Sequence, residues 1–112
     1  MIKPQTQGEV SFVSGGVGGD ERSAMQAIRA DYNLSLLFSV QGSGEYLSDV
    51  KVSITDAKGN TLLETVSDGP MLLASLKPGH YNVSAELDGQ VAHKKAMVGN
   101  KQRTSLSFIW PQ

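Results

Sequence analysis

Apolar and polar residues alternate one by one over much of the chain between residues 34 and 98, and glycine-containing turns interrupt the alternation at short intervals. Strict alternation is typical of β-strands that bury one face, because successive side chains of a strand point to opposite sides. The clearest case is the segment 50–55, where Val50, Val52 and Ile54 alternate with polar residues. About eight such segments fit between the turns, which predicts an all-β sandwich.

Three short motifs mark the centre of this pattern. Residues 68–70 read Asp-Gly-Pro and break the chain between two predicted strands. Residues 77–79 read Lys-Pro-Gly, and we expect a turn in which Pro78 presets φ and Gly79 takes the left-handed conformation. Residues 88–89 read Asp-Gly, the signal of a two-residue hairpin.

One helix is predicted, over residues 20–30. Asp20 is a suitable N-cap, and Ala24, Met25 and Ile28 supply a narrow apolar stripe. We expect this helix to cover one end or edge of the sandwich. The glycine-rich segment 14–19 before it is interpreted as a flexible connector, because the Lys-Ser/Thr pair of a phosphate-binding loop is missing and the acidic start of the helix would repel phosphate.

Length and composition limit the possible functions. The chain has 112 residues, and we divide it into a flexible N-terminal lead-in, 1–8, and a single sandwich domain, 9–112. Cysteine is absent, which excludes disulfides and thiolate chemistry. A net charge of −1 gives no field that favours nucleic acid, and no apolar run is long enough for a membrane span. We therefore predict no nucleic-acid partner and no membrane span.

The segment 47–108 resembles carboxypeptidase regulatory-like domains and the wider prealbumin-like (transthyretin-like) sandwiches. The residues that carry the resemblance are Val50-Lys51-Val52, Asp56 with Gly59, Asp68-Gly69, Leu76, Pro78-Gly79, Tyr81-Asn82-Val83 and Gly89. The resemblance implies a prealbumin-like (Ig-like) fold, and together with the strand and helix patterns it predicts a sandwich of seven or eight strands with one short helix near residues 20–30.

Taken whole, the chain looks like small bacterial envelope proteins that carry such a domain alone. This resemblance implies a periplasmic or secreted protein whose signal peptide is absent from the sequence. Our first hypothesis for the function is a non-catalytic binding or structural module of the envelope that contacts a protein or a glycan, with no cofactor, as a monomer or weak homodimer. The alternative is a small carbohydrate- or ligand-binding domain with a pocket near Tyr46.

A hydrolase is the least favoured hypothesis. The two histidines, His80 and His93, lie in no recognisable triad or nucleophile motif, and two histidines without cysteine make a poor zinc site. Hydroxyisourate hydrolases of the transthyretin-like fold end in Tyr-Arg-Gly-Ser, whereas this chain ends in Phe-Ile-Trp-Pro-Gln. Acidic residues in the turns are expected to cap backbone groups rather than to bind Ca²⁺, since no EF-hand spacing is present. We predict no catalytic and no metal-binding residues.

The candidate partner-binding residues are Glu45, Tyr46 and Trp110. Tyrosine and tryptophan are favoured anchors in binding sites, and Tyr46 lies in a predicted loop. Trp110 ends the last strand on the face of Leu106 and Phe108, so that a place in the core competes with a binding role. A basic cluster near one hairpin (His93, Lys94, Lys95, Lys101 and Arg103) is interpreted as protection of an exposed sheet edge.

Overall fold

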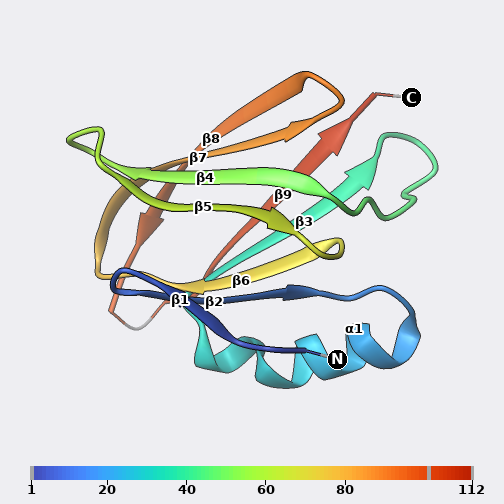
Figure 1. Cartoon of the computed structure of the whole chain (residues 1–112), viewed down its shortest axis with the longest axis horizontal. Coiled ribbons are helices and arrows are strands. Elements are labelled where there is room, and N and C mark those ends of the chain that lie inside the picture. The colour runs from blue at the N-terminus through green and yellow to red at the C-terminus, as the bar shows by residue number, and fades with distance from the viewer. Residues whose placement is uncertain (1, 101, 112) are drawn as a thin grey trace.

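The computed structural model describes residues 2–100 and 102–111, and it places two β-sheets face to face with one helix outside them (Figure 1). The five-stranded sheet A has the order β1-β2-β6-β3-β9, and the four-stranded sheet B has the order β5-β4-β7-β8. The elements are β1 (Gln5–Gln7), β2 (Val10–Gly15), α1 (Gly19–Ile28), the 3₁₀ turn η1 (Arg29–Asp31), β3 (Leu34–Val40), β4 (Val50–Asp56), β5 (Thr61–Ser67), β6 (Met71–Ser75), β7 (Gly79–Leu87), β8 (Gln90–Val98) and β9 (Thr104–Trp110).

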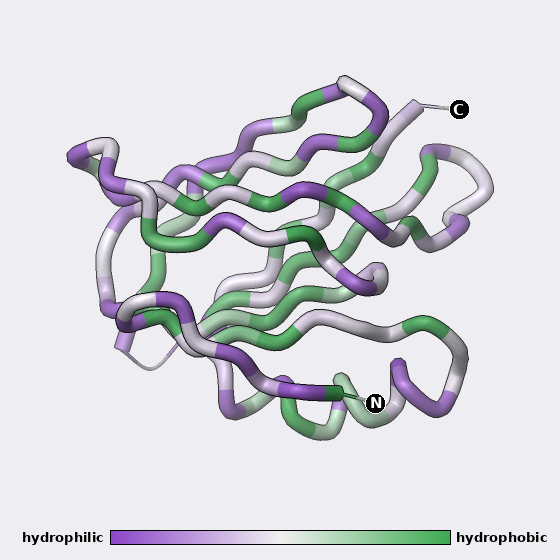
Figure 2. The backbone as a smooth tube through the Cα atoms, viewed as in Figure 1, coloured by the Kyte–Doolittle hydropathy of each residue, from purple (hydrophilic) through white to green (hydrophobic). Residues whose placement is uncertain are grey.

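The predicted all-β sandwich is confirmed. Strands pair antiparallel throughout both sheets except for β3 and β9, which run parallel in register from Leu34 with Thr104 to Val40 with Trp110. The alternation read from the sequence places Val50, Val52 and Ile54 in the buried space between the sheets. Hydrophobic residues gather along the facing strands, while the β4–β5 turn and much of β8 are hydrophilic (Figure 2).

Nine strands occur in the described part of the chain, where the sequence predicts seven or eight. The additional strand is β1, whose three residues are all exposed and pair with β2. It lies in the segment 1–8 that we expected to be a flexible lead-in. Its residues, Gln-Thr-Gln, show no alternation of apolar and polar side chains, so the hydrophobic pattern that predicts the other strands cannot reveal it.

The helix differs from the prediction in its start and its position. It begins at Gly19, and the N-cap is Gly18 rather than Asp20, which lies inside the first turn. Met25 is fully buried as expected, but Ala24 is exposed. The helix covers the outer face of sheet A rather than an end or edge of the sandwich. There it forms a second, smaller core with Val13, Met25, Met71 and Leu73.

Two of the predicted turns have the expected geometry and one does not. Asp88 and Gly89 have φ values of 51° and 81°, as a two-residue hairpin of type I′ requires. The Asp-Gly-Pro segment joins β5 to β6 as predicted. Gly79, however, has φ of 158° and is the first residue of β7, so the expected left-handed turn is wrong. Because the segment from Leu76 to Pro78 crosses between the two sheets, no tight turn is needed there.

Side chains join the two sheets along both of their open sides. On one side the amide of Gln7 in β1 accepts a hydrogen bond from the Glu64 N–H (2.8 Å) and donates one to the Glu64 carbonyl (3.1 Å) in β5. On the other side the Thr104 hydroxyl in β9 donates to the Met97 carbonyl (2.8 Å) in β8. These bonds occupy backbone groups that an edge strand would otherwise offer to another chain.

Lys94 supports the edge interpretation of the basic cluster. It lies opposite Val83 on the core-facing side of β8, and its ammonium group is 5.7 Å from the centre of the Phe108 ring. An inward-pointing lysine at the edge of a sandwich discourages the pairing of a further strand. Lys101, the fourth residue of that predicted cluster, lies outside the described residues.

Candidate functional site

A groove lies between α1 and the part of sheet A that the helix leaves uncovered. Sheet A presents an apolar outer surface on β2 and β6, which α1 covers, but its outer surface on β3 and β9 is formed largely by serines. The groove follows this boundary and has a volume of about 150 Å³. Pockets that enclose a small ligand are usually two or more times larger, so a ligand here would lie along the surface with one side exposed.

Arginines form the helical wall of the groove. Arg22 and Gln26 in α1 and Arg29 at the start of η1 are spaced four and three residues apart, which places them on one side of the helical segment. The Arg22 guanidinium lies 4.9 Å from the centre of the Tyr46 ring and donates a hydrogen bond to the Gly16 carbonyl (3.3 Å). Arg29 donates to the Ser105 hydroxyl (2.5 Å). Neither guanidinium forms an ion pair with a carboxylate within the described residues.

The floor of the groove consists of serine side chains that alternate with core residues. Ser35 in β3 lies opposite Ser105 in β9, and their hydroxyl groups are 3.1 Å apart. Ser107 follows two residues later on the same face, next to Leu37. Each hydroxyl can donate and accept hydrogen bonds. The floor therefore offers a row of polar groups beside two positive charges.

Tyr46 closes one end of this groove, and of the three predicted binding residues it alone lines the groove. It pairs as an isolated bridge with Ser39 and is 47% exposed. Glu45 is also exposed; its backbone carbonyl accepts a hydrogen bond from the Val40 N–H, but its side chain does not line the groove. The groove lies beside Tyr46, where the alternative hypothesis expects a pocket, and a binding role for Tyr46 stays a prediction.

Trp110 belongs to the core. Only 4% of its surface is exposed, its ring packs against Phe38 and Phe108, and its indole N–H donates to the Gln90 carbonyl (3.2 Å). Between the two interpretations that the sequence leaves open, its burial favours the structural one. The structure does not bring Trp110 into the groove with Tyr46.

Larger but less distinctive hollows lie elsewhere. The outer face of sheet B, which no other element covers in the described chain, carries shallow hollows of about 400 and 460 Å³. Lys51, Glu64 and Glu86 contribute charges of both signs to the first of these, and the second has His80 and Lys95 in its lining. Both are wide open, and neither contains an exposed aromatic ring.

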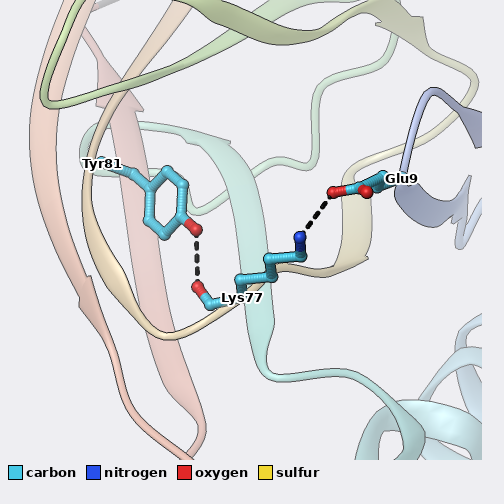
Figure 3. Close-up of polar contacts among 3 residues, drawn as sticks. All are labelled: Glu9, Lys77 and Tyr81. Carbon is cyan, nitrogen blue, oxygen red and sulfur yellow. Dashed lines mark hydrogen bonds and ion pairs between the residues drawn. The ribbon is translucent and has the colours of Figure 1, made fainter.

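A third hollow, of about 360 Å³, lies at the end of the sandwich where the β1–β2 turn approaches the segment between β6 and β7. There the Lys77 ammonium is 2.8 Å from the Glu9 carboxylate, and the Tyr81 hydroxyl donates to the Lys77 carbonyl (2.5 Å; Figure 3). The hydrogen bond and charge of Lys77 lower the pKa of Glu9, and Glu9 in turn raises the pKa of Lys77. Burial of the phenol and the nearby Asp56 carboxylate raise the pKa of Tyr81. The opposite charges at this site neutralise each other.

The acidic residue at the β4–β5 turn acts as the sequence predicts, by capping backbone groups. The Asp56 carboxylate accepts hydrogen bonds from the N–H groups of Lys58 and Asn60 (both 2.9 Å) and from the Asn60 side chain (3.1 Å). These bonds, the Asn60 backbone bond first among them, lower the pKa of Asp56. All of these hydrogen bonds come from residues of the same turn.

The residues considered for catalysis remain apart. His93 lies opposite Ser84 on the outer face of sheet B, but in the described residues no hydrogen bond joins either histidine to a serine or a carboxylate. A search of those residues also finds no group of three His, Cys, Asp or Glu side chains that could hold a metal ion. Within the same residues, no helix has both the length and the apolar character to cross a membrane.

Comparisons with known proteins add no family assignment. No protein-family model matches the chain, and no curated protein is significantly similar to it.

Sequence analysis misses the arginines and serines of the groove. The spacing of Arg22, Gln26 and Arg29 on one side of the helical segment is visible in the sequence, but the apolar stripe that predicts a helix gives no reason to single out polar residues on another side. The serines offer no such signal, because Ser35 and Ser105 are 70 residues apart and meet only through the parallel pairing of β3 with β9.

Proposed function

We propose that the protein is a non-catalytic binding module that holds an extended ligand, a glycan or a protein segment, in the Tyr46 groove. The observation that carries this proposal is the combination in one groove of an exposed aromatic ring with two guanidinium groups that are not neutralised by the described carboxylates. Tyrosine and arginine are among the residue types that dominate binding sites, and a guanidinium without a carboxylate partner keeps its capacity to pair with an anionic group of a ligand.

The proposal includes the class and location of the protein. The motifs between residues 47 and 108, together with a sandwich of two sheets, support a prealbumin-like domain. By the same resemblance we place the protein in the bacterial cell envelope, periplasmic or secreted, as a monomer or weak homodimer. Fractionation of cells that produce the full-length gene product tests the location, and recovery in the cytoplasm would contradict it.

Arrays of envelope glycans and peptides test the binding function directly. The purified domain should bind at least one ligand, and Tyr46→Ala should weaken that binding by roughly tenfold or more, as loss of an aromatic anchor does. Val66→Ala is the matched control, because Val66 is as exposed as Tyr46 (47%) but lies on β5 in the other sheet. Equal losses in both variants, or no binding to any probe, would contradict the proposal.

A further inference from the structure

The walls of the groove indicate the chemistry of its ligand. Arg22 in α1 and Arg29, the first residue of η1, are seven residues apart, so their backbone positions are separated by about 10 Å along the helical axis. Each guanidinium is half-buried against the sheet and makes its hydrogen bonds only to neutral oxygens, those of Gly16 and Ser105. Arginine pairs with anionic groups through several parallel hydrogen bonds, so both side chains can still bind a carboxylate.

The distance between the two arginines favours a ligand with more than one anionic group. A single small anion reaches one guanidinium, whereas two sites about 10 Å apart favour a chain that carries negative charges at regular intervals. The groove is open along its length and too small to enclose a compact ligand. A linear ligand with repeated anionic groups satisfies both conditions.

The floor favours a glycan over an acidic peptide. Extended peptides usually bind to sheets by pairing with the backbone of an edge strand. Of the two floor strands, β3 is paired on both sides, with β6 and β9. Strand β9 is the edge of sheet A, but its free side lies next to β8, where the Thr104 hydroxyl donates to the Met97 carbonyl. The hydroxyl groups of Ser35, Ser105 and Ser107, in contrast, can donate and accept hydrogen bonds as sugar hydroxyls require. The exposed ring of Tyr46 adds a flat surface at the end of the groove.

We infer that the ligand is an acidic polysaccharide whose carboxylate groups pair with Arg22 and Arg29 while its hydroxyl groups contact the serine floor. This inference rests on the proposed function, since it names the ligand class of the same groove. It does not involve the histidines or the Glu9–Lys77 pair, which lie outside the lining of the groove.

Calorimetric titration with a six-residue oligogalacturonate and with its fully methyl-esterified form tests the inference. The two probes share the same sugar backbone, and the ester replaces each carboxylate with an uncharged methyl ester. We expect the ester to bind at least tenfold more weakly, and Arg22→Gln and Arg29→Gln each to weaken binding of the acid form about tenfold. Lys95→Gln, which removes an exposed positive charge from sheet B, is the control and should leave the affinity unchanged. Unaltered urea midpoints, followed by Trp110 fluorescence, show that the variants remain folded.

Other results would overturn the inference in distinguishable ways. Equal binding of acid and ester, or an equal loss in Lys95→Gln, would show that the arginines do not select the charge. Equal or tighter binding of poly-glutamate would assign the groove to acidic peptides, and equal binding of the single sugar galacturonate would reduce it to a site for one anion. If an uncharged glycan binds in a Tyr46-dependent manner and the oligogalacturonate does not, the proposed function stands and this inference fails. If binding of no probe depends on Tyr46, both fail.

Discussion

Gly69 lies in the turn between β5 and β6, where it approaches the backbone of Gly15 at the end of β2. A Cβ atom at this position would overlap the carbonyl group of Gly15. The turn is fixed from both sides, because the buried Ser67 hydroxyl donates to the Gly69 carbonyl (2.7 Å) and the Asp68 N–H donates to the Ser14 hydroxyl (3.0 Å). Glycine is thus required for close packing, and its φ is not in the left-handed region.

Gly69→Ala should therefore destabilise the protein by about 2–3 kcal/mol, since the three atoms nearest to the new methyl group all belong to the Gly15 backbone. Gly19→Ala is the matched control: Gly19 opens α1, a Cβ there meets nothing, and alanine favours helices. Urea unfolding followed by Trp110 fluorescence compares the two. If the Gly69→Ala protein were as stable as the Gly19→Ala protein, the close approach of Gly69 to the Gly15 backbone would be contradicted.

Tyr81 lowers the stability of the folded protein at alkaline pH. Because its pKa is raised in the folded state by burial, the folded protein holds the phenol proton more tightly than the unfolded chain does. The contribution of Tyr81 to the free energy of unfolding is fully present below about pH 10, the usual tyrosine pKa. It is lost as the pH rises through the pKa of Tyr81 in the folded protein.

Removal of the phenol hydroxyl should abolish this part of the pH dependence. At pH 7, Tyr81→Phe should cost about 1 kcal/mol, because the Lys77 carbonyl loses its hydrogen-bond donor. Above about pH 10 the free energy of unfolding should fall more steeply in the wild type than in Tyr81→Phe, so that the two curves converge. Parallel curves over that range would show that Tyr81 does not titrate with the fold.

Among the elements, β1 is held by its pairing with β2 and by one side chain that reaches the other sheet. The Gln7 amide makes both hydrogen bonds to the Glu64 backbone that a neighbouring strand would make, and so closes the gap between β1 and β5. In the described chain it is the only side chain hydrogen-bonded to β5 from sheet A between Thr61 and Val66.

Gln7→Ala should expose this edge. We expect a loss of about 1 kcal/mol in stability and faster hydrogen exchange at the Glu64 N–H, which donates to Gln7 in the wild type. Gln5→Ala, on the same exposed strand, has no such bond to remove and serves as the control. Exchange at Glu64 that is unchanged in Gln7→Ala would contradict the role of Gln7 at the edge.

Strands that bury one face can be predicted from the alternation of apolar and polar residues, as β4 shows. The Asp88-Gly89 pair predicts its hairpin, because φ must be positive there and glycine allows this. The exposed strand β1 has no such pattern. The helix was predicted within two residues at either end, but the sheet face that it covers depends on Val13, Met71 and Leu73, which strand patterns alone do not pair with Met25.

At the scale of the whole molecule, the groove arises from incomplete coverage. The helix is ten residues long and covers the apolar part of the outer face of sheet A, and the serines of β3 and β9 remain uncovered beside it. Tyr46 was predictable from its loop position, but the floor depends on the pairing of β3 with β9 across 70 residues. Only the assembled sandwich brings Arg22, Arg29 and Ser105 together.

Ligand binding in the Tyr46 groove can be mapped residue by residue with a ¹H–¹⁵N correlation spectrum of the labelled domain, titrated with the array ligand that it binds most tightly. We expect shifts at Arg22, Tyr46, Ser105 and Ser107, with the outer face of sheet B unchanged. Shifts confined to sheet B, around Val66 and Val91, would place the binding face on the opposite side of the sandwich and contradict the account.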